Sequence, residues 1–119
     1  MSKLFLSASA YSTPGSNSTM LVISVADESG APVTNVKKSW ISASTLVPFL
    51  SGFVNLSIQD FASGANGFYS MTLKADPQKR VAFPFPGLPL TISVRKTILA
   101  RSGGSGVIAE GYITIPISG

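Results

Sequence analysis

The feature that most constrains this chain is an alternation of apolar and polar residues that returns in several separate segments. In a β-strand, successive side chains point to opposite faces, so such alternation gives one apolar face and one polar face. Four segments carry it: Val54–Gln59, Tyr69–Lys74, Leu90–Arg95 and Tyr112–Ile117. Most of the polar positions are Ser, Thr, Asn or Gln, which predicts antiparallel sheets with one solvated face.

Three further segments have strand-like composition. They are Lys3–Tyr11, Thr19–Ala26 and a part of Val33–Thr45. Clusters of Gly, Pro, Asn, Asp and Ser separate the strands at residues 13–17, 28–32, 63–67 and 102–106, and such clusters form turns. Residues Ser44–Phe53 are expected to hold at most one short helical turn, because Pro48 and Gly52 oppose a longer helix.

These segments predict an all-β fold of about seven or eight strands. Many short strands between Gly- and Pro-rich turns are typical of an antiparallel β-sandwich, and a closed barrel is the alternative arrangement. The length of 119 residues fits a single domain spanning residues 1–119. A domain of this size can bury a core without cross-links.

Two residue types that carry much enzyme chemistry are missing. The chain contains no Cys and no His. Thiol nucleophiles, disulfides and thiolate metal sites are therefore excluded, together with the commonest general base and the commonest transition-metal ligand. We expect a protein that is not an enzyme and that carries no cofactor and no metal.

The low charge points to a surface that contacts other proteins. Charged residues make up 12% of the chain, against about 25% in an average protein. Two interpretations are open: small polar residues cover the solvated sheet faces, or other subunits cover part of the surface. Because a weakly charged, β-rich surface tends to associate, copies of this chain or a larger assembly are the expected partners under the second interpretation. The net charge is +4, but the basic residues are scattered, which disfavours a nucleic-acid interface.

The sequence also bears on membranes and targeting. The longest uncharged stretch, Ser39–Gln59, contains six Ser and Thr residues, an Asn, a Pro and a Gly, so no membrane span is expected. The N-terminal residues 1–10 end in an Ala-x-Ala pattern, but their apolar run is short and is interrupted by Ser7. We therefore interpret this segment as the first strand. The sequence leaves the compartment unknown, and an extracellular or virion assembly is compatible with it.

Three motifs resemble those of immunoglobulin-like and transthyretin-like β-sandwich modules. Residues Leu21–Val33 (LVISVADESGAPV) resemble their strand followed by Asp-x-x-Gly-x-Pro-Val, and Gly67–Leu73 (GFYSMTL) resembles their Gly-x-Tyr strand entry. Phe85–Val94 (FPGLPLTISV) resembles their Pro-Gly turn and late strand. The resemblance implies an immunoglobulin-like antiparallel β-sandwich and no particular function. The missing Cys pair excludes the antibody branch.

The acidic pair in the first motif has two interpretations. Asp27 can accept a hydrogen bond from the backbone two residues ahead, while Gly30 and Pro32 shape the rest of a corner. A calcium site is the alternative, but Asp27 and Glu28 would point to opposite faces of a strand. We predict that this segment is a corner between strands.

The candidate partner-binding residues are aromatic and apolar. The segment Val81–Leu90 (VAFPFPGLPL) contains three Pro residues, which make it stiff. Phe83, Phe85 and Leu88 either cap one end of the core or form an exposed ledge for a partner. Trp40 has the same two interpretations, as core packing or as a ligand-stacking residue.

Together these observations predict a non-enzymatic structural or assembly module. It would associate with itself or dock onto a larger assembly such as a fibre, a surface layer, a virion or an injection apparatus. The alternative is a carbohydrate-binding module, with a glycan stacked on exposed aromatic rings. Its candidate platform residues are Tyr11, Trp40, Tyr69 and Tyr112.

Overall fold

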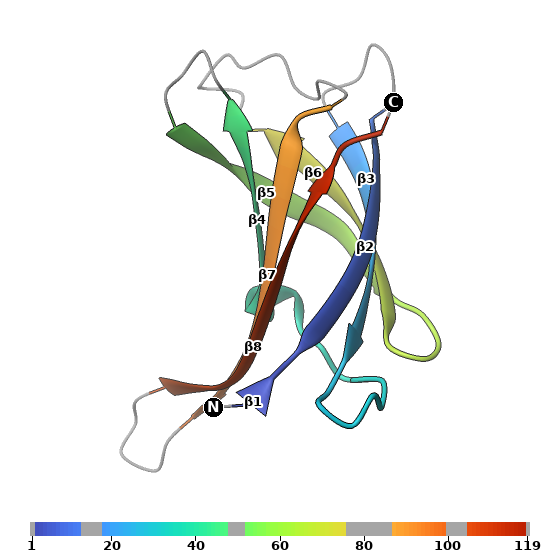
Figure 1. The fold of residues 1–119 in the computed structure, drawn as a ribbon, viewed down its shortest axis with the longest axis vertical. Coiled ribbons are helices and arrows are strands. Elements are labelled where there is room, and N and C mark those ends of the chain that lie inside the picture. Colours follow the sequence, from blue (N-terminus) through green and yellow to red (C-terminus); the bar gives the residue numbers. More distant parts are fainter. Residues whose placement is uncertain (1, 13–17, 48–51, 76–86, 100–104, 119) are drawn as a thin grey trace.

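Strands make up most of the chain in the computed structural model, which describes residues 2–12, 18–47, 52–75, 87–99 and 105–118. Within these residues there are eight strands and one 3-10 turn (Figure 1). The strands are β1 (Ser2–Lys3), β2 (Phe5–Ser12), β3 (Ser18–Ala26), β4 (Ile41–Val47), β5 (Gly52–Ser63), β6 (Phe68–Ala75), β7 (Pro89–Leu99) and β8 (Ser105–Pro116); the 3-10 turn η1 spans Lys38–Trp40. The all-β prediction is confirmed. No helix of the described residues has the length and apolar character needed to cross a bilayer.

All eight strands belong to one mixed sheet with the order β1-β8-β7-β4-β5-β6-β3-β2. Neighbouring strands are antiparallel except β1 and β8, which run parallel with Ser2 opposite Ala109. At the other end of β2, the Ser12 amide donates to the Ser118 carbonyl at 2.7 Å, and the Ser118 amide donates to the Ala10 carbonyl at 3.0 Å. The two ends of the sheet therefore meet, and the sheet is nearly closed (Figure 1).

The pairing differs from the expectation of two separate antiparallel sheets. β5 is twelve residues long and pairs with β4 over Gly52–Leu56 and with β6 over Leu56–Ser63. The register shifts between Gln59 and Ala62, where Asp60 has a φ of 53°. Such a bulge bends a strand and increases its twist. One bent strand thus connects two halves that a sandwich would keep apart.

The core follows from the alternation in the sequence. The inward residues of the four alternating segments pack together, and Leu90, Ile92 and Val94 of β7 have no exposed surface. Across from them, Tyr69 and Leu73 of β6 are equally enclosed. The assignment of inward and outward faces to these four segments is confirmed.

The strand expected within Val33–Thr45 begins only at Ile41. Residues before it form a loop and the turn η1, which ends at the buried Trp40. The Tyr69 hydroxyl holds this loop, because it donates to the Val33 carbonyl and accepts from the Val36 amide at 3.2 Å. Residues Ser44–Val47, for which a helical turn was the expectation, are strand, and residues 48–51 lie outside the described part of the chain.

Candidate functional site

The outward face of β2, β3 and β6 has an unusual composition for a solvated sheet surface. Strand register places Tyr11 opposite Met20, Met20 opposite Thr72, and Val22 opposite Ser70. The thirteen outward residues are Phe5, Ser7, Ser9 and Tyr11 of β2, Ser18, Met20, Val22, Ser24 and Ala26 of β3, and Phe68, Ser70, Thr72 and Lys74 of β6. Lys74 is the one charged residue among them.

Large apolar side chains on this face are open to solvent. Phe5, Tyr11, Met20, Val22 and Phe68 are all exposed, and half of the Phe68 surface is accessible. We call these five residues the apolar face. Small hydroxyl side chains separate them, so that Ser7, Ser9, Ser24 and the neighbours Val22 and Phe68 line a shallow hollow of about 140 Å³. The arrangement is a broad, weakly charged surface rather than a cleft for a reaction.

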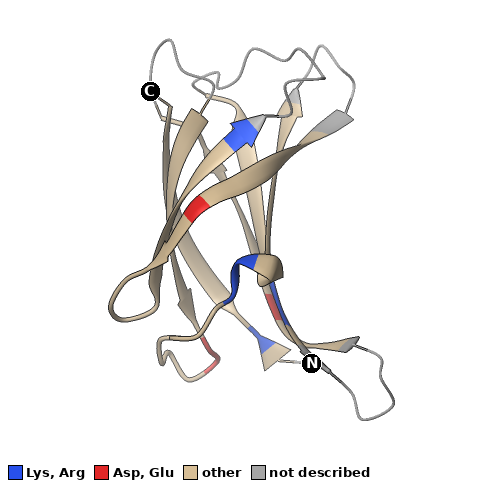
Figure 2. Cartoon of the chain, turned by 180° about the vertical axis from the view of Figure 1, so that it is seen from behind, with Lys and Arg blue, Asp and Glu red and all other residues tan. Residues whose placement is uncertain are grey.

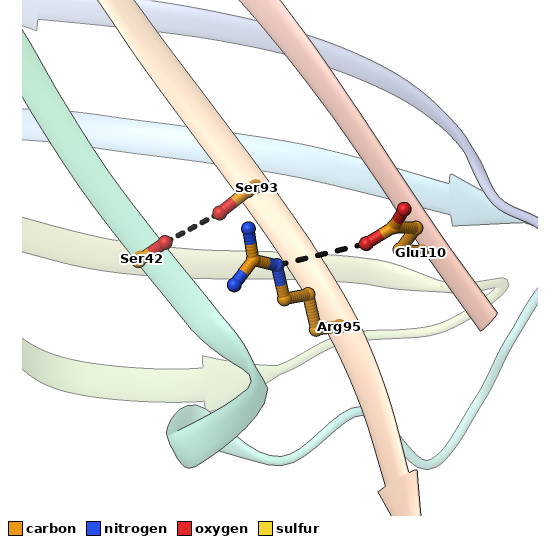
Figure 3. Close-up of polar contacts among 4 residues, drawn as sticks. All are labelled: Ser42, Ser93, Arg95 and Glu110. Atoms are coloured by element: carbon orange, nitrogen blue, oxygen red, sulfur yellow. Dashed lines mark hydrogen bonds and ion pairs between the residues drawn. The ribbon is translucent and has the colours of Figure 1, made fainter. Parts of the chain in front are cut away.

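The outward face of β4, β7 and β8 is built from hydroxyls and one ion pair. Ser42 and Ser93 are hydrogen-bonded across β4 and β7, and the Thr91 and Thr114 hydroxyls are 3.0 Å apart across β7 and β8. Arg95 Nε lies 3.7 Å from Glu110 Oε2, and both side chains are exposed (Figure 3). Cross-strand pairs of this kind stabilise a sheet modestly. A pocket of about 350 Å³ lies elsewhere, at β1 and the loop after β3, and Lys3, Asp27 and Lys96 are among its lining residues.

Figure 2 shows how few charged segments the described chain carries. Several of them gather towards the end of the molecule that carries the N-terminus. Strand pairing places Lys3 and Arg95 on either side of Glu110, and Lys37 and Lys38 lie at η1. The sheet surface away from that end carries little charge. The low charge seen in the sequence therefore translates into wide uncharged sheet faces.

The structure settles the role of the corner at 27–32. Asp27 Oδ1 accepts hydrogen bonds from the Ser29 hydroxyl at 2.6 Å, the Ser29 amide at 2.9 Å and the Ala31 amide at 3.0 Å. Gly30 has a φ of 86°, which favours Gly. The Ser29 hydroxyl bond is the largest cause that lowers the pKa of the Asp27 carboxyl; desolvation opposes it, and the backbone hydrogen bonds from Ala31, Ser29 and Gly30 lower the pKa further. The prediction of a corner is confirmed.

Two of the four sequence-predicted partner residues, Trp40 and Leu88, lie in the described structure. The Trp40 side chain is 8% exposed and belongs to the core, with Lys37 Nζ 5.9 Å from its ring centroid. Leu88 is half-buried and packs against the same core. Phe83 and Phe85 lie outside the described residues.

The candidate glycan platform is divided in the same way. Trp40 and Tyr69 are buried, whereas Tyr11 and Tyr112 are exposed. Tyr11 forms a bridge with Ser118, which follows Tyr112 by six residues in the sequence. About 20 Å of extended chain therefore separates the two exposed rings. A single stacking platform built from these four rings does not exist in this fold.

The apolar face was missed by sequence reasoning, although a signal for it exists. Met20, Leu21, Val22 and Ile23 form an uninterrupted apolar run within β3. A strand whose two faces are both apolar is typical of a strand that is covered on both sides. Phe5 and Phe68 give no such signal alone, because only strand register brings them to the same face.

Searches of protein families, curated proteins and solved structures find no match to this chain.

Proposed function

We propose that the chain is a non-enzymatic assembly module that associates with copies of itself through the apolar face. The observation that carries this proposal is the exposure of Phe5, Tyr11, Met20, Val22 and Phe68 on three adjacent strands with one charged neighbour, Lys74. Contiguous exposed apolar surface marks interaction sites. Aromatic residues and Met are enriched in protein interfaces, and charged residues are depleted from interface cores.

The occupant that fits this face best is a second copy of the same face. Two twisted sheet faces can pack against one another when their side chains are apolar or small, and the Ser residues between the aromatic rings allow close approach. A twofold contact needs only one self-complementary surface, which makes it the simplest oligomer to form. Such a module suits a repeating structure such as a fibre, a surface layer, a virion or an injection apparatus.

The strand neighbours support an immunoglobulin-like classification within this proposal. The order β2-β3-β6-β5 corresponds to the A-B-E-D sheet of a constant-type immunoglobulin domain, and β4-β7-β8 corresponds to its C-F-G sheet. Here the β4–β5 pairing joins the two. This architecture hosts many recognition and assembly roles, so the function rests on the apolar face and not on the fold.

The proposal is tested by sedimentation of the purified chain over a wide concentration range. The wild-type weight-average mass should rise above the single-chain 12.4 kDa with concentration. Phe68→Lys, which places a charge in the apolar face, should weaken association by at least about tenfold, or 1.4 kcal/mol. Tyr112→Lys is the matched control, because it replaces an even more exposed aromatic ring on β8. A mass of 12.4 kDa at every concentration, or equal weakening by both variants, would contradict the proposal.

A second candidate function rests on Tyr112. Its side chain is 77% exposed and lies opposite Ser93, with the Thr91 and Thr114 hydroxyls on the next rung of the same two strands. An aromatic ring beside hydroxyl groups is the chemistry that binds a sugar. A glycan array should then give hits that Tyr112→Ala abolishes and Tyr11→Ala retains. An array without hits would remove this candidate.

A further inference from the structure

β4 and β5 stop pairing at one end of their shared ladder. Beyond that end, each of the two strands has one edge without a neighbour among the described strands. Their pairing runs from Val47 opposite Gly52 to Ala43 opposite Leu56. Beyond that point β4 continues beside β7, with Ile41 opposite Val94, while β5 continues beside β6. Ile41–Ser42 and Ser57–Gln59 therefore each have one edge without a neighbour among the described strands.

A groove of about 530 Å³ lies at this separation. Its apolar lining consists of Ile41, Ala43, Leu56 and Ile58, and its polar lining consists of Lys38, Ser39, Ser42 and Asn55. A volume of this size lies in the range of about 300–1,000 Å³ typical of binding pockets. Apolar side chains flanked by unpaired strand edges are the features that bind an added β-strand, because its backbone pairs with the edge and alternate side chains enter the groove.

The hairpin of β7 and β8 supplies such a strand. Towards the hairpin tip, the last β7 residue that pairs with β4 is Val94, and the last β8 residue that pairs with β1 is Ala109. The remaining part of each strand pairs only with the other, and it projects beyond the rest of the sheet (Figure 1). Val107 and Ile108 are exposed there, and Ile108 is the extra residue of a bulge. Among the described strands, the edge of β8 from Ser105 to Ile108 therefore has no neighbour other than β7, and it carries two β-branched side chains.

The hairpin does not reach the groove of its own chain. In the sheet order, β4 lies between β7 and the groove. The hairpin also leads away from the body of the molecule in both overall views (Figures 1 and 2). A hairpin strand can thus occupy a groove only when it comes from another copy.

We propose that the β7–β8 hairpin of one copy adds as a strand to the open edges of the β4–β5 groove of a second copy. This inference rests on the proposed self-association and adds a second contact to it. Donor and acceptor are different surfaces, so the contact is head-to-tail and builds a filament or a closed ring. Combined with the apolar face, it would give an assembly that extends in more than one direction.

Disulfide trapping tests this contact directly, since the chain has no Cys of its own. Ile58→Cys places a thiol in the groove, and Val107→Cys places one on the hairpin of a different copy. Ala65→Cys is the matched control, because Ala65 is exposed and lies in the turn between β5 and β6, away from the groove. When the two single-cysteine chains are mixed and oxidised, the Ile58 pair should form the mixed disulfide at least about five-fold faster than the Ala65 pair, since docking raises the effective concentration of the thiols.

A charge variant of the hairpin gives an independent measurement that does not disturb the core. Val107→Lys combined with Ile108→Lys should lower the weight-average mass of the concentrated chain in sedimentation, whereas Ala65→Lys in the exposed turn between β5 and β6 should leave it unchanged. Equal cross-linking of the Ile58 and Ala65 pairs in a chain that does oligomerise would overturn the hairpin contact and leave the proposed function standing. Absence of any oligomer would overturn both.

Discussion

The hydroxyl of Tyr69 donates a hydrogen bond to the carbonyl of Val33, which ties the start of β6 to the loop that precedes η1. The same hydroxyl accepts a bond from the Val36 amide at 3.2 Å, and the Tyr69 ring stacks on Phe61 with centroids 5.7 Å apart. One buried side chain thus satisfies two backbone groups of an irregular segment.

Tyr69→Phe is expected to destabilise the fold by about 1–3 kcal/mol, because it leaves a buried carbonyl and amide without their partner while the ring stays in place. Urea unfolding followed by circular dichroism measures the change. Tyr112→Phe, at a highly exposed position, should stay within about 0.5 kcal/mol of the wild type. Equal effects of the two variants would refute the bridging role of Tyr69.

Two fully buried threonines should respond to the same substitution with opposite signs. Thr45 Oγ1 donates to the Pro89 carbonyl at 2.8 Å, whereas Thr19 Oγ1 has no hydrogen-bond partner among the described residues. Thr45→Val should therefore cost about 1 kcal/mol, and Thr19→Val should be neutral or raise stability by about 1 kcal/mol. Thermal unfolding of both variants decides this, and destabilisation by Thr19→Val would show that its hydroxyl is bonded.

Gly111 is the position where β8 comes closest to the N-terminal strand. A Cβ at this residue would lie 2.2 Å from the Leu4 carbonyl oxygen, next to the bond from the Leu4 amide to the Glu110 carbonyl. Gly111→Ala should push the two strands apart, cost about 1–3 kcal/mol and speed hydrogen exchange of the Leu4 amide. Gly106→Ala, with open space around its Cβ, should be neutral or stabilise by about 0.5–1 kcal/mol.

The corner at Asp27 predicts a specific pH dependence. Hydrogen bonds from Ser29 and from backbone amides lower the pKa of Asp27 below its ordinary value of 3.8. A carboxylate whose pKa is lower in the folded than in the unfolded chain stabilises the fold above the unfolded pKa, and this contribution is lost as the pH falls through the folded pKa. The stability advantage of wild type over Asp27→Asn should be constant above about pH 5 and shrink below about pH 4.

Acid titration of both chains, with unfolding measured at each pH, tests this expectation. The other carboxylates are common to the two proteins, so their effects cancel in the difference. If the stability advantage of the wild type over Asp27→Asn instead grows as the pH falls, the pKa of Asp27 is not lowered in the folded chain.

Local sequence pattern predicted most of the strands, their inward faces and the corner at Asp27, although the strand expected within Val33–Thr45 begins only at Ile41. These features depend on neighbours within a few residues: alternation sets which side chain points inward, and an Asx turn closes within four residues. Local pattern therefore predicted that Leu90, Ile92 and Val94 are core residues, and the structure buries all three completely.

Only the tertiary structure decided which strands meet and what surface results. The meeting of β2 with β8, the departure of β5 from β4, and the gathering of Phe5, Met20 and Phe68 on one face all depend on contacts between residues far apart in the chain. Trp40 illustrates the same limit, because its burial depends on packing against other strands and not on its neighbours in sequence. Side-chain direction is a local property of a strand, whereas register and closure belong to the whole sheet.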